Sequence, residues 1–297
     1  MLFRSATVDD RLMGITHILR GEEWLGSAPK MIHLYNVLEW EAPVFAHLPV
    51  ILGTDRKKLS KRHGSTNFRA FIEQGYLPEA LINFLVLLGW STGEENRELL
   101  SINEIIERFS LSGITEHPAI FDYEKLKWMN GHYIRSSQPG RITGLCIPYL
   151  VKAGLLSNPP TPEEVAYARR IIPLEQERMK VLSEVVDLVG FFFKELNYPN
   201  GYDEKAIAKW MGVAHIKALL EKEIAAFESL PEWTTEAIEA ASRAIGEELG
   251  VKFAEVVHPT RVATTGQTVG PGLFETLWAL GRERTLERLR TVLAHLS

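Results

Sequence analysis

The property that narrows the fold most is a series of helix signals that runs from near residue 75 to the end of the chain. Apolar residues recur there at three- and four-residue spacing, and capping pairs such as Ser101 with Glu104 open the segments. Gly89 follows one of these apolar segments as a stop signal. Residues 140 to 297 offer helices rather than short alternating strands, so they predict a helical bundle of about 150 residues.

The apolar spacing and the capping residues together predict where the helices lie. Asp122 is expected to cap a helix that ends at Asn130 and Gly131, and Thr161 with Glu164 is expected to open another. Residues 174–196 read as one long amphipathic helix. The predicted helices span residues 27–40, 76–90, 101–109, 122–130, 161–173, 174–196, 203–210, 214–227, 235–249 and 273–295.

The first 55 residues carry a different pattern, in which strands and helices alternate. A strand is predicted over Leu12 to Gly21, where Ile15, Thr16 and Ile18 are β-branched. A second short strand is predicted over His47 to Leu52, after the helix that begins near Ser27. This alternation implies an α/β segment, but one too small to form a complete doubly wound sheet.

A strongly basic loop, "RKKLSKRHGST", occupies residues 56–66 of a chain whose net charge is −5. Lysine supplies a mobile positive charge, arginine adds a fork of donors, and glycine allows close backbone approach. Lys58, Ser60, Lys61 and Arg62 could therefore clamp the phosphates of a nucleotide. A solvated surface loop is the alternative interpretation. The chain contains no Walker phosphate-binding sequence.

Composition narrows the class of protein. With 297 residues, 45% hydrophobic and 24% charged, the chain suits a globular protein of about two or three domains. No apolar run reaches the roughly 20 residues that a bilayer requires. The single cysteine, Cys146, excludes an internal disulfide and a cysteine-rich metal site. These properties suit the cytosol.

The order of residues within the basic loop resembles a known signature. "KLSKR" is similar to the Lys-Met-Ser-Lys-Ser signature of class I aminoacyl-tRNA synthetases, and the form followed by "HG" is typical of glutamyl-tRNA synthetases. Other stretches resemble the same bacterial family in the same order, from about Val8 to the C-terminus. They include "DDRLMGITHILRGEEWLGSAPK", "PVFAHLPVIL", "GYLPEALINFLVLLGWS", "FDYEKLKWMNGHYIR" and the tail "HPTRVATTGQTVGPGLFETLWALGRERTLERL".

The resemblance implies a mainly α fold in three parts. Residues 1–66 would be a remnant of the Rossmann-type α/β catalytic domain, and residues 67–138 a mixed connector that contacts the tRNA stem. Residues 139–297 would form an all-helical anticodon-binding domain with two subdomains split near residue 200.

The resemblance also implies a reaction and a set of site residues. The family joins glutamate to tRNA-Glu through a glutamyl-adenylate, with ATP as substrate and Mg²⁺ expected with it, in a cytoplasmic and usually monomeric enzyme. The catalytic residues would be Lys58, Ser60, Lys61 and Arg62. ATP would be bound by Trp24, Val50 and Ile51 together with Lys58 and Lys61. Arg20 would bind the glutamate carboxylate, and Arg178 would read the third anticodon base.

Alternative roles for single residues remain open at this point. Arg20 could instead form a structural ion pair with Glu22 or Glu23, and Trp24 could belong to the core. The last helix carries arginines that could contact RNA phosphates or could line a solvated face with acidic neighbours. They are Arg282, Arg284, Arg288 and Arg290.

The chain departs from the family pattern in one respect. The family's second ATP signature, of the His-Ile-Gly-His type, does not occur in this sequence. We therefore expect the chain to be a C-terminal portion that lacks the N-terminal half of the catalytic domain and is inactive alone. Two alternatives are a non-catalytic module that binds the tRNA anticodon arm, and a relative of glutaminyl-tRNA synthetase.

Overall fold

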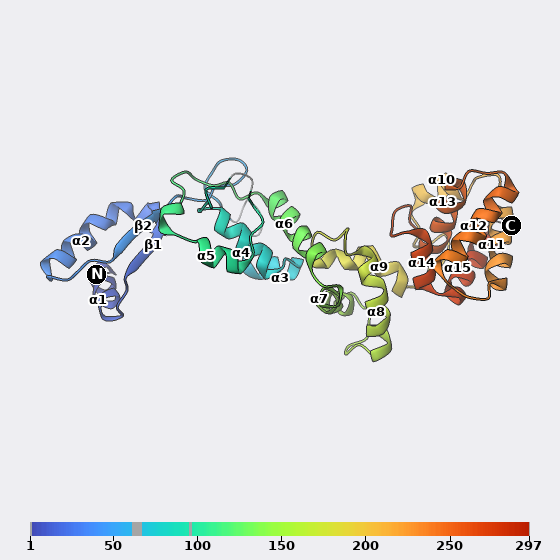
Figure 1. Cartoon of the computed structure of the whole chain (residues 1–297), viewed down its shortest axis with the longest axis horizontal. Coiled ribbons are helices and arrows are strands. Elements are labelled where there is room, and N and C mark those ends of the chain that lie inside the picture. The colour runs from blue at the N-terminus through green and yellow to red at the C-terminus, as the bar shows by residue number, and fades with distance from the viewer. Residues whose placement is uncertain (1, 61–66, 95–96, 297) are drawn as a thin grey trace. The chain divides into compact units, whose positions relative to one another are not determined.

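The computed structural model describes residues 2–60, 67–94 and 97–296. It divides into two compact units, Met1–Tyr133 and Ile134–Ser297, and the boundary falls inside helix α6 (Tyr123–Ser136). Helices dominate both units, and the strands form one small parallel sheet in the first (Figure 1). The predicted fold class, mainly α with a small α/β part, is confirmed.

The first unit opens with two parallel strands and their helices. The strands pair in register from His17 opposite Val44 to Gly21 opposite Leu48, so their carboxyl ends lie side by side. Met31 and Tyr35 are the buried large side chains of the intervening helix. The elements are α1 (Leu2–Leu12), β1 (His17–Gly21), the 3₁₀ helix η1 (Glu22–Ser27), α2 (Ala28–Val37) and β2 (Val44–Leu48).

Both predicted strands were misplaced by a few residues. The first begins at His17 rather than Leu12, because α1 continues to Leu12 and Gly14, at φ +69°, turns the chain out of the helix. The second covers Val44–Leu48 rather than residues 47–52. Pro49 follows it directly and has no N–H to extend the ladder.

The rest of the first unit is a helical connector around an aromatic core. Phe84 and Phe121 pack edge to face with ring centroids 4.9 Å apart, and Leu126 and Met129 are fully buried beside them. Its helices are α3 (Phe68–Gln74), α4 (Pro78–Leu87), α5 (Ile102–Arg108), the 3₁₀ helix η3 (Leu111–Gly113) and α6.

Helix α6 begins where the sequence predicts but does not end at Asn130. Asp122 Oδ1 accepts from the Glu124 amide at 2.9 Å, as expected of an N-cap. Asn130 is fully buried, and its Oδ1 accepts from the Leu77 amide at 2.7 Å. Since this side chain ties α6 to the start of α4, the Asn130–Gly131 pair continues the helix instead of stopping it.

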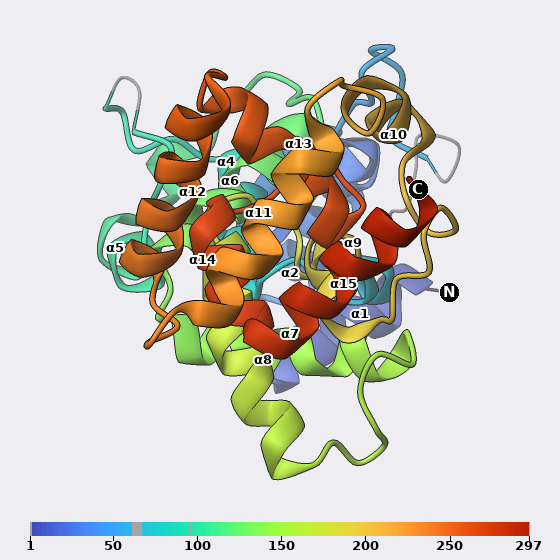
Figure 2. The same ribbon diagram turned by 90° about the vertical axis from the view of Figure 1, so that its right-hand side faces the viewer.

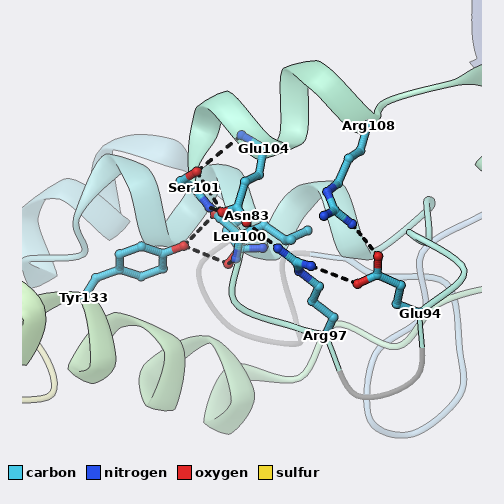
Figure 3. A network of polar contacts seen from close by, with 8 residues as sticks. All are labelled: Asn83, Glu94, Arg97, Leu100, Ser101, Glu104, Arg108 and Tyr133. Carbon is cyan, nitrogen blue, oxygen red and sulfur yellow. Dashed lines mark hydrogen bonds and ion pairs between the residues drawn. The ribbon is translucent and has the colours of Figure 1, made fainter.

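A polar network fixes α5 against α4 and α6 (Figure 3). Ser101 and Glu104 form the predicted capping box. The buried Asn83 Oδ1 accepts from the Leu100 amide at 3.0 Å, and the Tyr133 hydroxyl lies 2.9 Å from the same oxygen. Exposed ion pairs join Arg97 and Arg108 to Glu94. The buried Asn83 oxygen therefore links Leu100 to Tyr133 of α6, whereas exposed ion pairs of this kind contribute little.

The second unit is entirely helical in its described residues. Its first helix carries Cys146, which is fully buried with Sγ 3.9 Å from Met179 Sδ, and burial raises the pKa of this thiol to about 12. The helices are α7 (Pro139–Lys152), α8 (Pro162–Glu175), the 3₁₀ helix η4 (Leu182–Glu184), α9 (Val185–Phe193), α10 (Glu204–Trp210), α11 (Ile216–Ser229), α12 (Thr235–Leu249), α13 (Ala254–Thr265), α14 (Leu273–Leu280) and α15 (Arg282–His295).

Two helices predicted as continuous are interrupted. The helix expected over residues 174–196 is broken between α8 and α9, where the Glu184 carboxylate accepts from the Lys180 amide at 2.7 Å and starts a new turn. The helix expected over residues 273–295 breaks at Gly281, at φ +85°. The sequence analysis also did not predict α7 and α13.

Helix α11 packs against α12, α13 and α15 in the last part of the unit (Figure 2). Three buried charged residues, Glu223, Arg261 and Arg288, lie among these helices. Glu223 of α11 is fully buried, with Oε1 2.6 Å from Thr260 Oγ1, and Arg288 of α15 is only 3% exposed. Arg288 therefore neither lines a solvated face nor is available for an RNA phosphate. In the part of the chain that the structure describes, no helix is long and apolar enough to cross a membrane.

Candidate functional site

Arg20 lies at the carboxyl end of β1, directly opposite His47 of β2. Its Nε donates to His47 Nε2 at 3.2 Å, and its Nη1 lies 3.2 Å from Met31 Sδ. The guanidinium carbon also lies 5.4 Å from the centre of the Phe45 ring. A half-buried guanidinium is thus held by a ring nitrogen, a thioether and an aromatic ring, none of which carries a formal negative charge.

The third nitrogen of this guanidinium, Nη2, is buried without a hydrogen-bond partner among the described residues. The expected alternative, an ion pair with Glu22 or Glu23, is not formed there. Glu22 Oε1 accepts from the Val50 amide at 3.4 Å, and Glu23 Oε1 lies 3.8 Å from Lys58 Nζ. Since a buried unpaired donor costs free energy, Arg20 is suited to an anionic ligand that supplies the missing acceptor.

The start of the basic loop is a tight hairpin anchored to the connector core. The Gly53 amide donates to the Lys57 carbonyl at 2.8 Å, and the Leu59 amide donates to the Ile51 carbonyl at 2.8 Å. Leu52 pairs with the segment around Ile120, and the side chains of Ile51 and Leu59 pack on the core cluster. The hairpin presents Lys58, whose side chain is 68% exposed.

The other residues predicted to bind the nucleotide lie in η1 and in the segment that follows β2. Trp24 in η1 is 50% exposed, so it does not belong to the core. Val50 and Ile51 continue from β2 into the hairpin, and Ser60 is the last described residue of this segment. Lys61 and Arg62 lie outside the described residues.

Two contacts join the segment after β1 to Val50 and to the basic hairpin. Glu22 and Glu23 follow β1 directly and contact Val50 and Lys58. Open parallel α/β sheets bind ligands at the carboxyl ends of their strands, which is where these contacts lie. The sequence analysis missed His47, Met31 and Phe45 as neighbours of Arg20, because the register of the strand pair cannot be read from the sequence.

Arg178 belongs to the second unit and lies in the turn after α8. Its Nη1 donates to both carboxylate oxygens of Glu175, at 2.7 and 2.8 Å, and its side chain remains 39% exposed. Glu175 is completely buried, and this burial raises the pKa of its carboxyl although Arg178 opposes the shift. The three-residue spacing could have identified this partner from the sequence.

Comparisons with known proteins agree over both units. Residues 5–128 match the catalytic domain of class I tRNA synthetases (E and Q), and residues 141–293 match the anticodon binding domain family. The glutamate–tRNA ligase of Moorella thermoacetica is 44% identical over 286 residues, which are 96% of this chain and 57% of the relative. The glutamate–tRNA ligase of Herpetosiphon aurantiacus is 42% identical over 294 residues, which are 99% of this chain and 59% of the relative.

Solved structures give the same result. A glutamate tRNA ligase from Elizabethkingia meningosepticum, in complex with its amino acid, aligns with a TM-score of 0.88 and 31% sequence identity. The alignment covers 100% of this chain and 60% of that one. A glutamate-tRNA synthetase from Elizabethkingia anophelis aligns with a TM-score of 0.84 and 30% identity, over 99% of this chain and 60% of that one.

A class I synthetase catalytic region followed by an anticodon binding domain defines an aminoacyl-tRNA synthetase architecture. The chain belongs to the glutamate–tRNA ligase family within that class. It spans between 57% and 60% of the length of the relatives named above.

Proposed function

We propose that this chain is part of a glutamate–tRNA ligase, which activates glutamate with ATP and transfers it to tRNA-Glu. The observation that carries the proposal is Arg20, a half-buried guanidinium without a carboxylate partner among the described residues, at the strand ends of a class I catalytic region. Cytoplasmic location, a monomeric state and Mg²⁺ bound with the ATP phosphates belong to the same proposal.

Arg20 would bind the carboxylate of the glutamate substrate. A carboxylate oxygen at Nη2 would satisfy the buried donor and form a charge-assisted hydrogen bond, which is about twice as strong as a neutral one. A glutamine amide would offer only a neutral oxygen at the same point. The site would therefore favour glutamate over glutamine by electrostatics rather than by shape.

The basic hairpin would bind the triphosphate of ATP. The ion pair of Lys58 with Glu23 is exposed on both sides, at 68% and 50%, and such pairs contribute about 0–1 kcal/mol. A phosphate can therefore displace Glu23 from Lys58 readily. Lys58 would then bind the triphosphate together with Ser60, Lys61 and Arg62. Trp24 and the backbone at Val50 and Ile51 would contact the nucleoside.

The second unit would bind tRNA-Glu, with Arg178 at the third anticodon base. Guanidinium groups suit base edges because they donate two parallel hydrogen bonds. The division into a catalytic remnant at 1–66, a stem-contact connector at 67–138 and an anticodon-binding domain at 139–297, split near 200, remains part of this proposal.

An exchange assay tests the catalytic proposal. We would join this chain to the part of the Moorella thermoacetica relative that it does not match, and measure ATP–pyrophosphate exchange with glutamate and tRNA-Glu. We expect exchange with glutamate and not with glutamine, and we expect Arg20→Gln to raise the KM for glutamate about 50-fold, because a charged hydrogen bond is worth about 1.5–3 kcal/mol. The KM for ATP should change little.

Arg11→Gln is the matched control, because it removes the same charge from an exposed residue of the same unit. An unchanged KM for glutamate in Arg20→Gln would contradict the assignment of Arg20. A joined protein that binds tRNA-Glu but shows no exchange would instead favour the second candidate, a non-catalytic anticodon-binding module, which the match over residues 141–293 also supports. Exchange with glutamine would favour the glutaminyl relative.

A further inference from the structure

The turn that carries Arg178 is anchored on both sides of this residue. Gln176 is 5% exposed, and its Nε2 lies 2.8 Å from the carbonyls of both Ile134 and Ser137. Met179 is fully buried against Cys146. The backbone on either side of Arg178 is therefore fixed, and the direction of its side chain depends on what its guanidinium contacts.

Glu175 makes the guanidinium contacts of Arg178 that the structure shows. Both of its oxygens accept from Nη1, and Nε and Nη2 carry no hydrogen bond among the described residues. One side of the guanidinium is thus occupied by a buried carboxylate. The other two nitrogens keep their donors for a ligand, in the partly exposed portion of the side chain.

The charges around this pair are balanced. Arg261 of α13 also interacts electrostatically with Glu175, but it is 8% exposed and its Nη1 donates to the Pro271 carbonyl at 2.6 Å. A second acid, Glu275 of α14, acts on Arg261 in turn. Arg178 itself donates to both oxygens of the Glu175 carboxylate, so it does not present an uncompensated positive charge.

We propose that Glu175 is a positioning residue that orients and neutralises Arg178, so that this arginine recognises a neutral base edge and not a phosphate. The proposal rests on the proposed function, in which Arg178 reads an anticodon base. It assigns to Glu175 a part of the selection between tRNAs, although its buried carboxylate does not itself touch the RNA.

The physical reason is the difference between a charge contact and a hydrogen-bond contact. An arginine that binds phosphate releases counterions, so affinity for single-stranded RNA falls with salt by a slope of about 0.7 per contact. A neutralised arginine contributes little to that slope. It discriminates through geometry, since a wrong base leaves its donors unpaired.

The test uses the whole chain and two transcripts, tRNA-Glu and the same tRNA with its third anticodon base changed from cytosine to guanine. Dissociation constants are measured for both across a range of salt concentrations. For Glu175→Gln we expect the preference for tRNA-Glu to fall about tenfold, and the salt slope to steepen by about 0.7 for both transcripts. Glu177→Gln is the matched control, because it removes the same charge from an exposed neighbour and should change neither quantity.

Glu175→Asp separates orientation from charge, and it also serves if Glu175→Gln fails to fold. Aspartate keeps the carboxylate but places it farther from the Arg178 guanidinium, because its side chain is shorter. This variant should therefore reduce the preference for tRNA-Glu and leave the salt slope unchanged. In an Arg178→Gln background, Glu175→Gln should have no further effect on the preference. An unaltered preference and slope in both Glu175 variants, with a lost preference in Arg178→Gln, would overturn the role of Glu175. A chain that never preferred tRNA-Glu would instead count against the proposed function.

Discussion

Replacing Arg288 by methionine is expected to lower the free energy of unfolding of the second unit by about 3 kcal/mol. Arg288 Nη1 donates to the Thr264 carbonyl at 2.6 Å, and Nη2 donates to the carbonyls of Phe191 and Lys194 at 2.7 and 2.9 Å. This one side chain joins α15 to the ends of α9 and α13. Methionine fills similar space without donors, and each buried carbonyl that loses its partner costs about 1–3 kcal/mol.

Chemical denaturation followed by circular dichroism measures this loss. Arg290→Met is the control, since Arg290 lies on the same helix but is 55% exposed, and its partner among the described residues is the exposed Glu228. Such surface pairs contribute about 0–1 kcal/mol. Equal stabilities for Arg288→Met and Arg290→Met would show that the three carbonyl contacts do not stabilise the unit.

Replacing Glu223 by glutamine is expected to stabilise the second unit by about 2–4 kcal/mol at pH 8 and to have little effect near pH 5. Burial raises the pKa of the Glu223 carboxyl to about 8, from an unfolded value of 4.5. Its Oε2 is buried without a partner among the described residues. The Thr260 hydroxyl lies 2.6 Å from Glu223 and 2.7 Å from the Val256 carbonyl, so a protonated Glu223 lets the single hydroxyl hydrogen serve Val256.

The sign follows from proton linkage. The folded chain keeps the proton up to about pH 8, while the unfolded chain loses it near pH 4.5, so the stability from this group is complete below pH 4.5 and declines as the pH rises toward 8. Glutamine removes this decline. The measurement is the free energy of unfolding of both proteins at several pH values, with the exposed Glu221→Gln as control. A difference between wild type and Glu223→Gln that does not grow with pH would refute the prediction.

The local signals in the sequence predicted the starts of several helices, although α1, α3, α7 and α13 were not predicted. The capping boxes at Ser101 and Thr161 form as expected, because an N-cap depends on residues within one turn of each other. The break between α8 and α9 was not predicted, because an unbroken apolar spacing hides a turn that side chains such as Glu184 stabilise. The continuation of α6 through Asn130 depends on Leu77, which is far away in sequence.

For the candidate site, too, local features could be predicted from the sequence and long-range contacts could not. The candidate residues, Arg20 and the basic loop, could be proposed from the sequence because their chemistry is visible in single side chains and short motifs. Their surroundings were not, because the pairing of Arg20 with His47 depends on strand register and the open donor of Arg20 depends on packing. The burial of Glu175, the carboxylate that accepts from Arg178, was not predicted because a sequence does not show burial.

The position of the single cysteine also gives the protein a built-in chemical reporter. Cys146 is fully enclosed in α7, and its thiol stays protonated through the neutral range, so an alkylating reagent can modify it only when the surrounding helices separate. The rate of modification then measures how often the second unit opens, without any introduced label. Variants that loosen these helices could be ranked by the rate at which the protein gains the mass of one adduct.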